Sequence, residues 1–197
     1  YLIPSSGCSL RGYLAAGNLK IIVDAALLGE LATLAGQQAD DAPDILICPP
    51  HPLLAHAVAV TDGSPVGIGG QDCHAAQTGA HTGDVSAPMI AATGAQAVIV
   101  GHSERRADHH ESNEMVRAKA TAAMAAGLTT ILCIGESEAE RLGDDTLTII
   151  ADQMHASVPD TATGDSLVIA YEPIWSIGTG RVPNLAQIVE THDMLRD

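Results

Sequence analysis

Short apolar runs recur along the chain, and most are apolar at every position instead of alternating with polar residues. The run Val98, Ile99, Val100 is typical. Continuous runs of this kind indicate strands buried on both faces, as in a parallel sheet. Six such strands are predicted, over Tyr13–Gly17, Asp44–Cys48, Val66–Gly70, Ala97–Gly101, Thr130–Ile134 and Leu167–Tyr171.

Longer segments with helical spacing lie between these strands. Predicted helices cover Asp24–Ala35, Ser112–Ala126, Asp144–Ser157 and Leu185–Leu195. In the second helix the apolar positions are Met115, Ala118, Ala122 and Ala125, which leaves Lys119 on the polar, solvent-facing side. The alternation of strands and helices predicts a parallel α/β fold.

Two parallel α/β architectures fit this alternation. A doubly wound nucleotide-binding sheet carries a Gly-rich phosphate turn after its first strand, and no GxGxxG or GxxxxGK pattern marks such a turn here. A (β/α) barrel instead distributes its functional groups over many strand ends. Polar residues follow nearly every predicted strand, namely Asn18, Lys20, Gln71, Asp72, His102, Glu104, Glu136 and Glu172. This distribution favours the barrel.

Composition narrows the function classes. The 197 residues suit one domain, and 24 acidic against 9 basic residues give a formal charge of −15. This charge disfavours nucleic acid and anionic membranes as partners. The four cysteines show no CxxC spacing, and the opening segment, which begins at Tyr1, does not resemble a secretory signal. We therefore expect a cytoplasmic protein.

Three residues are candidates for chemistry. Lys20 follows a strand and is either an anion ligand or a solvated loop lysine. His102 ends a buried strand and can polarise a carbonyl or move protons, or it is a structural histidine beside an ion-pair network. Glu172 ends another buried strand and is followed first by rigid Pro173 and then by the flexible Gly178-Thr179-Gly180 segment. That pattern is more typical of a base with a closing lid than of a structural carboxylate.

Four segments, from about Gly12 onward, resemble the signature motifs of the triosephosphate isomerase family in the family's order. They are Gly17-Asn18-x-Lys20, Gly79-Ala80-His81-Thr82-Gly83, Val100-Gly101-His102-Ser103-Glu104-Arg105-Arg106 and Tyr171-Glu172-Pro173-x-Trp175-x-Ile177-Gly178-Thr179-Gly180. The resemblance implies an aldose–ketose isomerase that interconverts dihydroxyacetone phosphate and D-glyceraldehyde 3-phosphate through an enediolate, in glycolysis and gluconeogenesis. It implies neither a metal nor an organic cofactor.

The resemblance also implies a role for each matching residue. Glu172 is then the base, His102 the electrophile that polarises the carbonyl, and Lys20 the cation that stabilises negative charge, with Asn18 beside it. Gly178 would donate its backbone N–H to the substrate phosphate as the Pro173–Gly180 lid closes. The family is dimeric, which implies a homodimer with Thr82 at the tip of an interface loop and an Asp84–Arg105 pair across the interface.

Some features depart from the family pattern. The family barrel has eight strands in about 250 residues, whereas six strands are found here; residues 12–197 are therefore interpreted as an incomplete barrel and residues 1–11 as an unmatched segment. The outer edges of the first and sixth strands are expected to be unpaired. Leu19 and the segment Ile21-Ile22-Val23 also differ from the family's usual residues. An alternative function is thus a catalytically weak or inactive remnant that serves as a binding or assembly module.

Other residues are expected to be structural. Cys133 is interpreted as a packing residue rather than a nucleophile. The pairs Cys73-His74 and His109-His110 lack the spacing of a zinc site, so no metal site is predicted.

Overall fold

The computed structural model describes residues 2–3, 14–21, 26–37, 44–143 and 145–196. One curved sheet forms its centre, in the spatial order β1-β7-β6-β5-β4-β3-β2. Six of the strands are parallel: β2 (Leu14–Asn18), β3 (Asp44–Cys48), β4 (Val66–Gly70), β5 (Ala97–Val100), β6 (Thr129–Ile134) and β7 (Leu167–Tyr171). Each pairs with the next along the chain, which is the topology of a (β/α) barrel and confirms the predicted fold class. The predicted start at Tyr13 lies outside the described residues.

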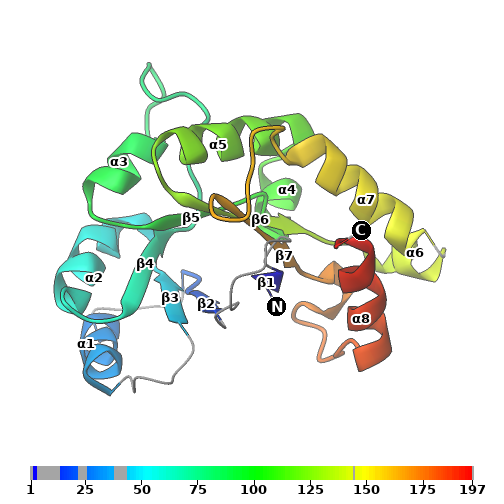
Figure 1. Ribbon diagram of the computed structural model, residues 1–197, viewed down its shortest axis with the longest axis horizontal. Coiled ribbons are helices and arrows are strands. Elements are labelled where there is room, and N and C mark those ends of the chain that lie inside the picture. The colour runs from blue at the N-terminus through cyan, green and yellow to red at the C-terminus, as the bar shows by residue number, and fades with distance from the viewer. Residues whose placement is uncertain (1, 4–13, 22–25, 38–43, 144, 197) are drawn as a thin grey trace.

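Helices follow the outer side of the curved sheet, from α1 through α5 to α8 (Figure 1). They are α1 (Leu27–Gln37), α2 (Leu54–Thr61), α3 (Ala87–Ala92), α4 (Ser103–Asp108), α5 (Asn113–Ala125), α6 (Glu138–Leu142), α7 (Thr146–Ser157) and α8 (Leu185–Met194), with 3₁₀ turns η1 (His51–Leu53) and η2 (Ile174–Ser176). Side chains of Ser112 and Asn184 cap α5 and α8 by accepting from the backbone N–H groups of Met115 and Gln187. No helix in the described ranges is long and apolar enough to cross a membrane.

The two faces of the sheet carry separate apolar cores. The larger core lies between strands and helices and includes Val98, Val100 and Leu132 with Val116 of α5 and Ile150 of α7. The smaller core lies on the other face and contains Leu46, Cys48, Ala97, Ile99, Ile131 and Cys133. Adjacent residues of β5 thus enter opposite cores, which explains why the strand sequences are apolar throughout.

The outer edge of β7 is paired, so the expectation of two unpaired edges is wrong on this side. Strand β1 (Leu2–Ile3) runs antiparallel to β7, with Leu2 opposite Ala170 and Ile3 opposite Ile169. Short edge pairing of this kind covers the hydrogen-bonding groups that an edge strand exposes. The predicted boundary between residues 11 and 12 lies outside the described residues.

The buried face of α5 differs from the predicted one. Of the predicted apolar positions, Ala122 is buried but Met115 is 47% exposed, whereas Val116, Lys119, Ala120 and Ala123 are all buried. These four positions have the i, i+3, i+4, i+7 spacing of a single helix face. The prediction that Lys119 lies at the surface is therefore wrong: its ammonium group enters the interior, where acidic partners compensate for its charge.

Candidate active site

Lys20 lies just beyond the end of β2, next to Asn18. The backbone N–H of Leu19 donates to the carbonyl of Cys48 over 3.0 Å. The side-chain amide of Gln71 donates to the same carbonyl over 2.9 Å and also to the carbonyl of Leu19. These bonds extend the β2–β3 pairing past the strand end. Lys20 is therefore anchored at the carboxyl edge of the sheet, although Leu19 differs from the family's usual residue.

His102 caps the N-terminus of α4, and this contact determines which ring nitrogen carries a proton. Its Nδ1 accepts from the backbone N–H of Glu104 over 3.2 Å. A neutral imidazole has one donor and one acceptor nitrogen, so its proton then lies on Nε2. The ring is 12% exposed, and Nε2 is directed toward Glu172. The neutral ring therefore offers an N–H donor at the strand ends.

Glu172 follows β7 and places its carboxylate against that donor. One oxygen lies 3.2 Å from His102 Nε2, and the other accepts from the backbone N–H of Ser103 over 2.7 Å. The side chain is 17% exposed. A side chain at Gly135 would collide with the backbone carbonyl of Glu172, so glycine is required where the loop after β6 passes the end of β7.

A positive charge lies beside the same imidazole. The ammonium of Lys20 is 2.9 Å from His102 Nε2 and donates to a carboxylate oxygen of Glu104 over 2.8 Å. Lys20 has only donors, so its approach to the protonated Nε2 sets two donors against each other; this contact is repulsive, and Glu104 is the group that accepts a hydrogen bond from Lys20. The Lys20 bond lowers the pKa of Glu104 below its ordinary value, although Glu104 is half exposed.

An open cleft of about 480 Å³ lies over these groups at the carboxyl ends of the strands. Its walls are lined by Asn18, Lys20, Ile21, His51, Gln71, Asp72, His102, Glu104, Arg105, Asp108 and His109. Glu172 is not among the lining residues, and its carboxylate meets the cleft through His102. The structure thus brings together Asn18, Lys20, His102 and Glu172, which come from three different strand ends.

The segment after β7 is attached at its start and exposed at its tip. Glu136, which is fully buried, accepts from Trp175 Nε1 over 2.8 Å and from the Tyr171 hydroxyl over 3.1 Å. Burial, followed by the charge of Glu136, raises the pKa of Tyr171 to about 12. Residues 177–180, including Gly178, are exposed. An anchored start and an exposed tip are what a lid needs.

The sequence matches the family profile described as triosephosphate isomerase over residues 13–197. This chain belongs to the triosephosphate isomerase family. It is 54% identical to the triosephosphate isomerase of Dinoroseobacter shibae over 95% of this chain and 76% of that protein, and 54% identical to the one of Ruegeria pomeroyi over 95% and 74%. The crystal structure of triosephosphate isomerase from Bartonella henselae superposes with a TM-score of 0.86 at 39% identity, covering 94% of this chain and 74% of that one.

In this member of the triosephosphate isomerase family, a largely buried charge network adjoins the cleft, which its members Asp72 and Arg105 also line. Lys119 contacts both oxygens of Asp72 at 2.8 and 2.7 Å and Glu111 at 2.6 Å. Arg105 Nε contacts the same two carboxylates at 2.8 and 2.6 Å. Burial raises the pKa of Asp72, whereas in Glu111 the bonds from Lys119 and Arg105 outweigh burial and lower the pKa. Arg105 therefore has partners within its own chain.

Sequence reasoning missed several residues that position this triosephosphate isomerase site. Gln71 was noted only as a polar residue after a strand, and nothing in the pattern indicated that it ties two strand ends together. The pattern also did not indicate that Glu136 binds Tyr171 and Trp175, or that the backbone N–H of Ser103 donates to Glu172. Cys133 is buried, and burial raises its pKa well above the ordinary value, in agreement with a packing role.

Proposed function

We propose that this chain interconverts dihydroxyacetone phosphate and D-glyceraldehyde 3-phosphate, with Glu172, His102 and Lys20 as its catalytic residues. Its membership of the triosephosphate isomerase family supports the activity. The observation that carries the assignment of roles is the proximity of three groups: the Glu172 carboxylate lies 3.2 Å and the Lys20 ammonium 2.9 Å from His102 Nε2.

The reaction needs a base that acts on one substrate carbon and an acid that acts on the oxygen of the adjacent carbonyl. The Glu172 carboxylate removes a proton from the carbon next to the carbonyl, while the His102 Nε2–H donates to the carbonyl oxygen, giving an enediolate-type intermediate. Glu172 then gives its proton to the former carbonyl carbon while His102 regains a proton from the hydroxyl oxygen on the first carbon, which becomes the new carbonyl, so the isomerisation is redox-neutral. A preorganised N–H and the Lys20 ammonium stabilise the negative charge as it develops.

Glu172 must exchange partners during this cycle. In the present state its carboxylate accepts from the Ser103 N–H, so it has to leave this donor to reach a substrate carbon. We assign Asn18 and Lys20 to substrate binding because both line the cleft. Gly178 lies in the exposed tip of the lid. On closure its backbone N–H would reach the substrate phosphate, and the closed lid would exclude water from the site.

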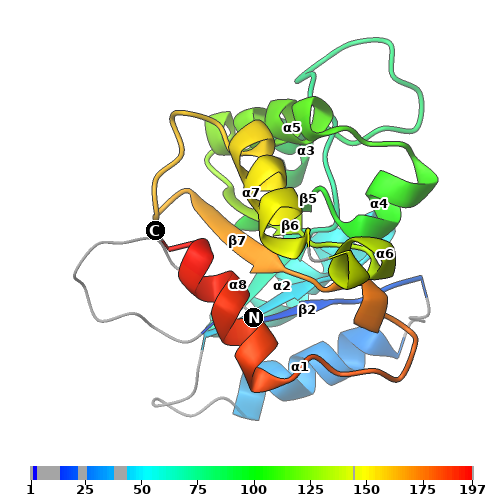
Figure 2. The same cartoon turned by 90° about the vertical axis from the view of Figure 1, so that its right-hand side faces the viewer.

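We also propose a homodimer. The loop between β4 and α3 projects away from the body of the molecule in both views (Figures 1 and 2), and Thr82 within this loop is exposed. An open cleft beside the catalytic groups offers a second copy of this loop a surface to occupy. Arg105 binds Asp72 and Glu111 of its own chain and Asp84 faces His74, so any Asp84–Arg105 contact between copies would add to these pairs.

A cytoplasmic location suits this reaction, because its substrates belong to glycolysis and gluconeogenesis. The described cysteines Cys48, Cys73 and Cys133 are free and buried, as is usual in a reducing compartment.

The test is isomerisation of either triose phosphate by the chain, with Glu172→Gln as the matched variant. Gln keeps the shape of the side chain but cannot accept the proton, so turnover should fall by about 10² to 10⁴-fold. Circular dichroism and thermal unfolding establish that both chains fold. Equal rates in the two folded chains would contradict the role of Glu172, and a folded parent without activity would favour the binding-module alternative.

A further inference from the structure

Arg106, in the first turns of α4, reaches back with its side chain to the residue that precedes His102. Its Nε donates to the carbonyl of Gly101 over 2.8 Å. That carbonyl belongs to the peptide bond that joins Gly101 to His102, directly after β5 ends at Val100. Arg106 therefore holds the backbone from which the His102 ring extends.

Gly101 makes the turn that this contact stabilises. Its φ of 67° lies in the left-handed region, and a side chain at this position would come within 2.7 Å of Val116 and 3.1 Å of Arg106 Nη2. After the turn, the carbonyl of His102 accepts from the backbone N–H groups of Arg105 and Arg106 and so begins α4. Arg106 thus fixes the two peptide groups on either side of His102, one through its side chain and one through its backbone.

The same guanidinium reaches the next strand of the sheet. Its Nη2 donates to the carbonyl of Cys133 in β6 and to the hydroxyl of fully buried Ser157, each over 3.4 Å. Cys133 is paired with Ala170 of β7, two residues before Glu172. One side chain therefore joins the end of β5 to β6, and β6 in turn carries the strand that presents the carboxylate.

Neutral partners hold the guanidinium in this orientation. Its Nη1 donates to Asn113 Oδ1 over 2.7 Å, and the Ser157 hydroxyl donates to the same oxygen over 3.2 Å. The acceptors of Arg106 among the described residues are two backbone carbonyls, one amide oxygen and one hydroxyl, whereas neighbouring Arg105 binds two carboxylates. A planar guanidinium with five donors in a rigid fork can bridge several acceptors at once. The contacts of Arg106 are those of a bridge between backbone segments and not of an ion pair.

We propose that Arg106 is a positioning residue for the isomerisation, a role that rests on the proposed function: it bridges the ends of β5 and β6 so that the His102 N–H and the Glu172 carboxylate face one another. These two groups are 3.2 Å apart and extend from different strands, so their separation depends on how the strand ends are held. Arg106 acts through the backbone and does not itself contact the reacting atoms.

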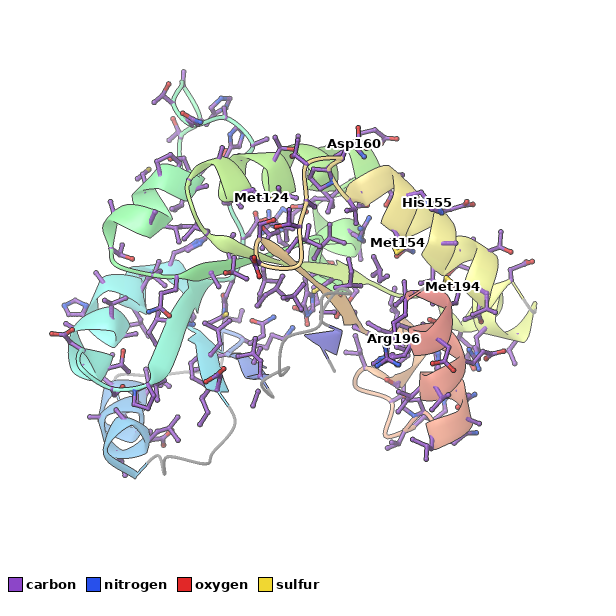
Figure 3. The ribbon with its side chains drawn as sticks, in the orientation of Figure 1. Met124, Met154, His155, Asp160, Met194 and Arg196 are labelled. Carbon is purple, nitrogen blue, oxygen red and sulfur yellow. The ribbon has the colours of Figure 1, made fainter. Side chains whose placement is uncertain are left out.

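The experiment measures steady-state kinetics of Arg106→Met, with Arg117→Met as the matched control. Arg117 also donates to a backbone carbonyl, that of Val158, and pairs with exposed Asp160 at the outer surface (Figure 3). Arg106→Met should lower kcat by about 10- to 100-fold, because a misplacement of about 1 Å can cost up to this factor. KM should change far less, since the residues assigned to substrate binding follow β2, outside this bridge. The control should match the parent in both constants.

Arg106→Lys separates the charge from the bridge. Lysine keeps the positive charge and can donate to one carbonyl, but its single ammonium cannot replace the fork that spans Gly101, Asn113 and Cys133. We therefore expect kcat to fall in this variant as well. A parent-like kcat in folded Arg106→Lys would overturn the bridge, and because this variant retains the cation, it decides the question even if Arg106→Met does not fold.

Nitrogen-15 NMR of the His102 ring supplies a measurement that needs no isomerase activity. Under conditions in which the ring is neutral, the parent and Arg117→Met should show Nδ1 as an acceptor and Nε2 as an N–H, with signals assigned by their absence in His102→Gln. The two tautomers should mix in both Arg106 variants, because the ring is no longer held against the Glu104 N–H. A single, parent-like tautomer in a folded Arg106 variant would overturn the proposal. If the parent lacked isomerase activity, the proposed function would fail, while the ring signals would still show whether Arg106 positions His102.

Discussion

Two clusters of charged side chains meet at α4, where the consecutive residues Glu104 and Arg105 belong to different clusters. The cleft cluster consists of Lys20, His102, Glu104 and Glu172. The buried network consists of Asp72, Arg105, Glu111 and Lys119. Both combine acidic and basic groups at short distances, yet they differ in how their charges are satisfied.

The buried network offers each charge two partners, whereas the cleft cluster leaves its charges room to change partners. Lys119 and Glu111 have 8% and 1% of their side chains exposed, and both bind opposite charges at 2.6 Å. Lys20 and Glu104 are 37% and 51% exposed, and Glu172 binds a backbone N–H and an imidazole, both of which a substrate could replace. Short ion pairs alone therefore do not identify an active site; exchangeable partners do.

The largest expected effect comes from breaking the cleft cluster at His102. His102→Gln removes the imidazole that positions an N–H between Glu172 and the substrate carbonyl. We expect kcat to fall by about 10² to 10⁴-fold, as for loss of a general acid, with a much smaller change in KM, since the interaction strengthens as charge develops. Steady-state kinetics in both reaction directions measure the two constants separately.

The control for this variant is His155→Gln, which removes an exposed histidine of α7 (Figure 3) that does not line the cleft. It should match the parent in both constants. A His102→Gln enzyme that changes only in KM would contradict the electrophile role and leave His102 as a binding residue.

The buried network should respond in stability instead of turnover. Lys119→Met keeps much of the side-chain length but leaves Asp72 and Glu111 with Arg105 as their only remaining cation in the network. Removing one partner from a buried ion pair costs about 3–5 kcal/mol of unfolding free energy. Urea denaturation followed by circular dichroism measures this loss, and turnover per folded molecule should fall far less than in His102→Gln.

Arg196→Met is the comparison for that measurement. Arg196 lies at the end of α8 and pairs with Asp193 over 3.5 Å, both side chains being at least half exposed (Figure 3). An exposed pair contributes only about 0–1 kcal/mol. If Lys119→Met destabilised the protein no more than Arg196→Met does, the structural role of the buried network would be wrong.

The strands could be predicted from the sequence because their apolar runs are long and clearly bounded. The predicted bounds of β3, β4 and β7 agree with the structure, and those of β5 and β6 differ by one residue. Short helices such as α3 and α4 were not predicted. Each has six residues, too few for a periodic pattern, and α4 consists mostly of charged residues.

The charged residues show the limit of pattern reasoning most clearly. In α5 alanine occurs on several faces, so periodicity alone could not select the buried one, and Lys119 was assigned to solvent. Its acidic partners Asp72 and Glu111 lie 47 and 8 positions away in the chain. Motif resemblance placed Lys20, His102 and Glu172 together, but the proton position on His102 depends on the Glu104 N–H, which only the folded geometry provides.

The smallest expected effect concerns the strained residue at the border of the buried network. His110 has a φ of 55° and directly precedes Glu111. The left-handed conformation costs a non-glycine residue about 1–2 kcal/mol, which glycine would avoid. Glycine also loses more backbone entropy on folding, which cancels about 0.5–1 kcal/mol of this stabilisation. His110→Gly should therefore raise the unfolding free energy by about 0.5–1 kcal/mol, measured by urea denaturation. His109→Gly is the matched control, because His109 has a φ of −112° and gains nothing from glycine. If both variants lost stability equally, glycine would relieve no strain at position 110, and the left-handed conformation of His110 would not destabilise the folded protein.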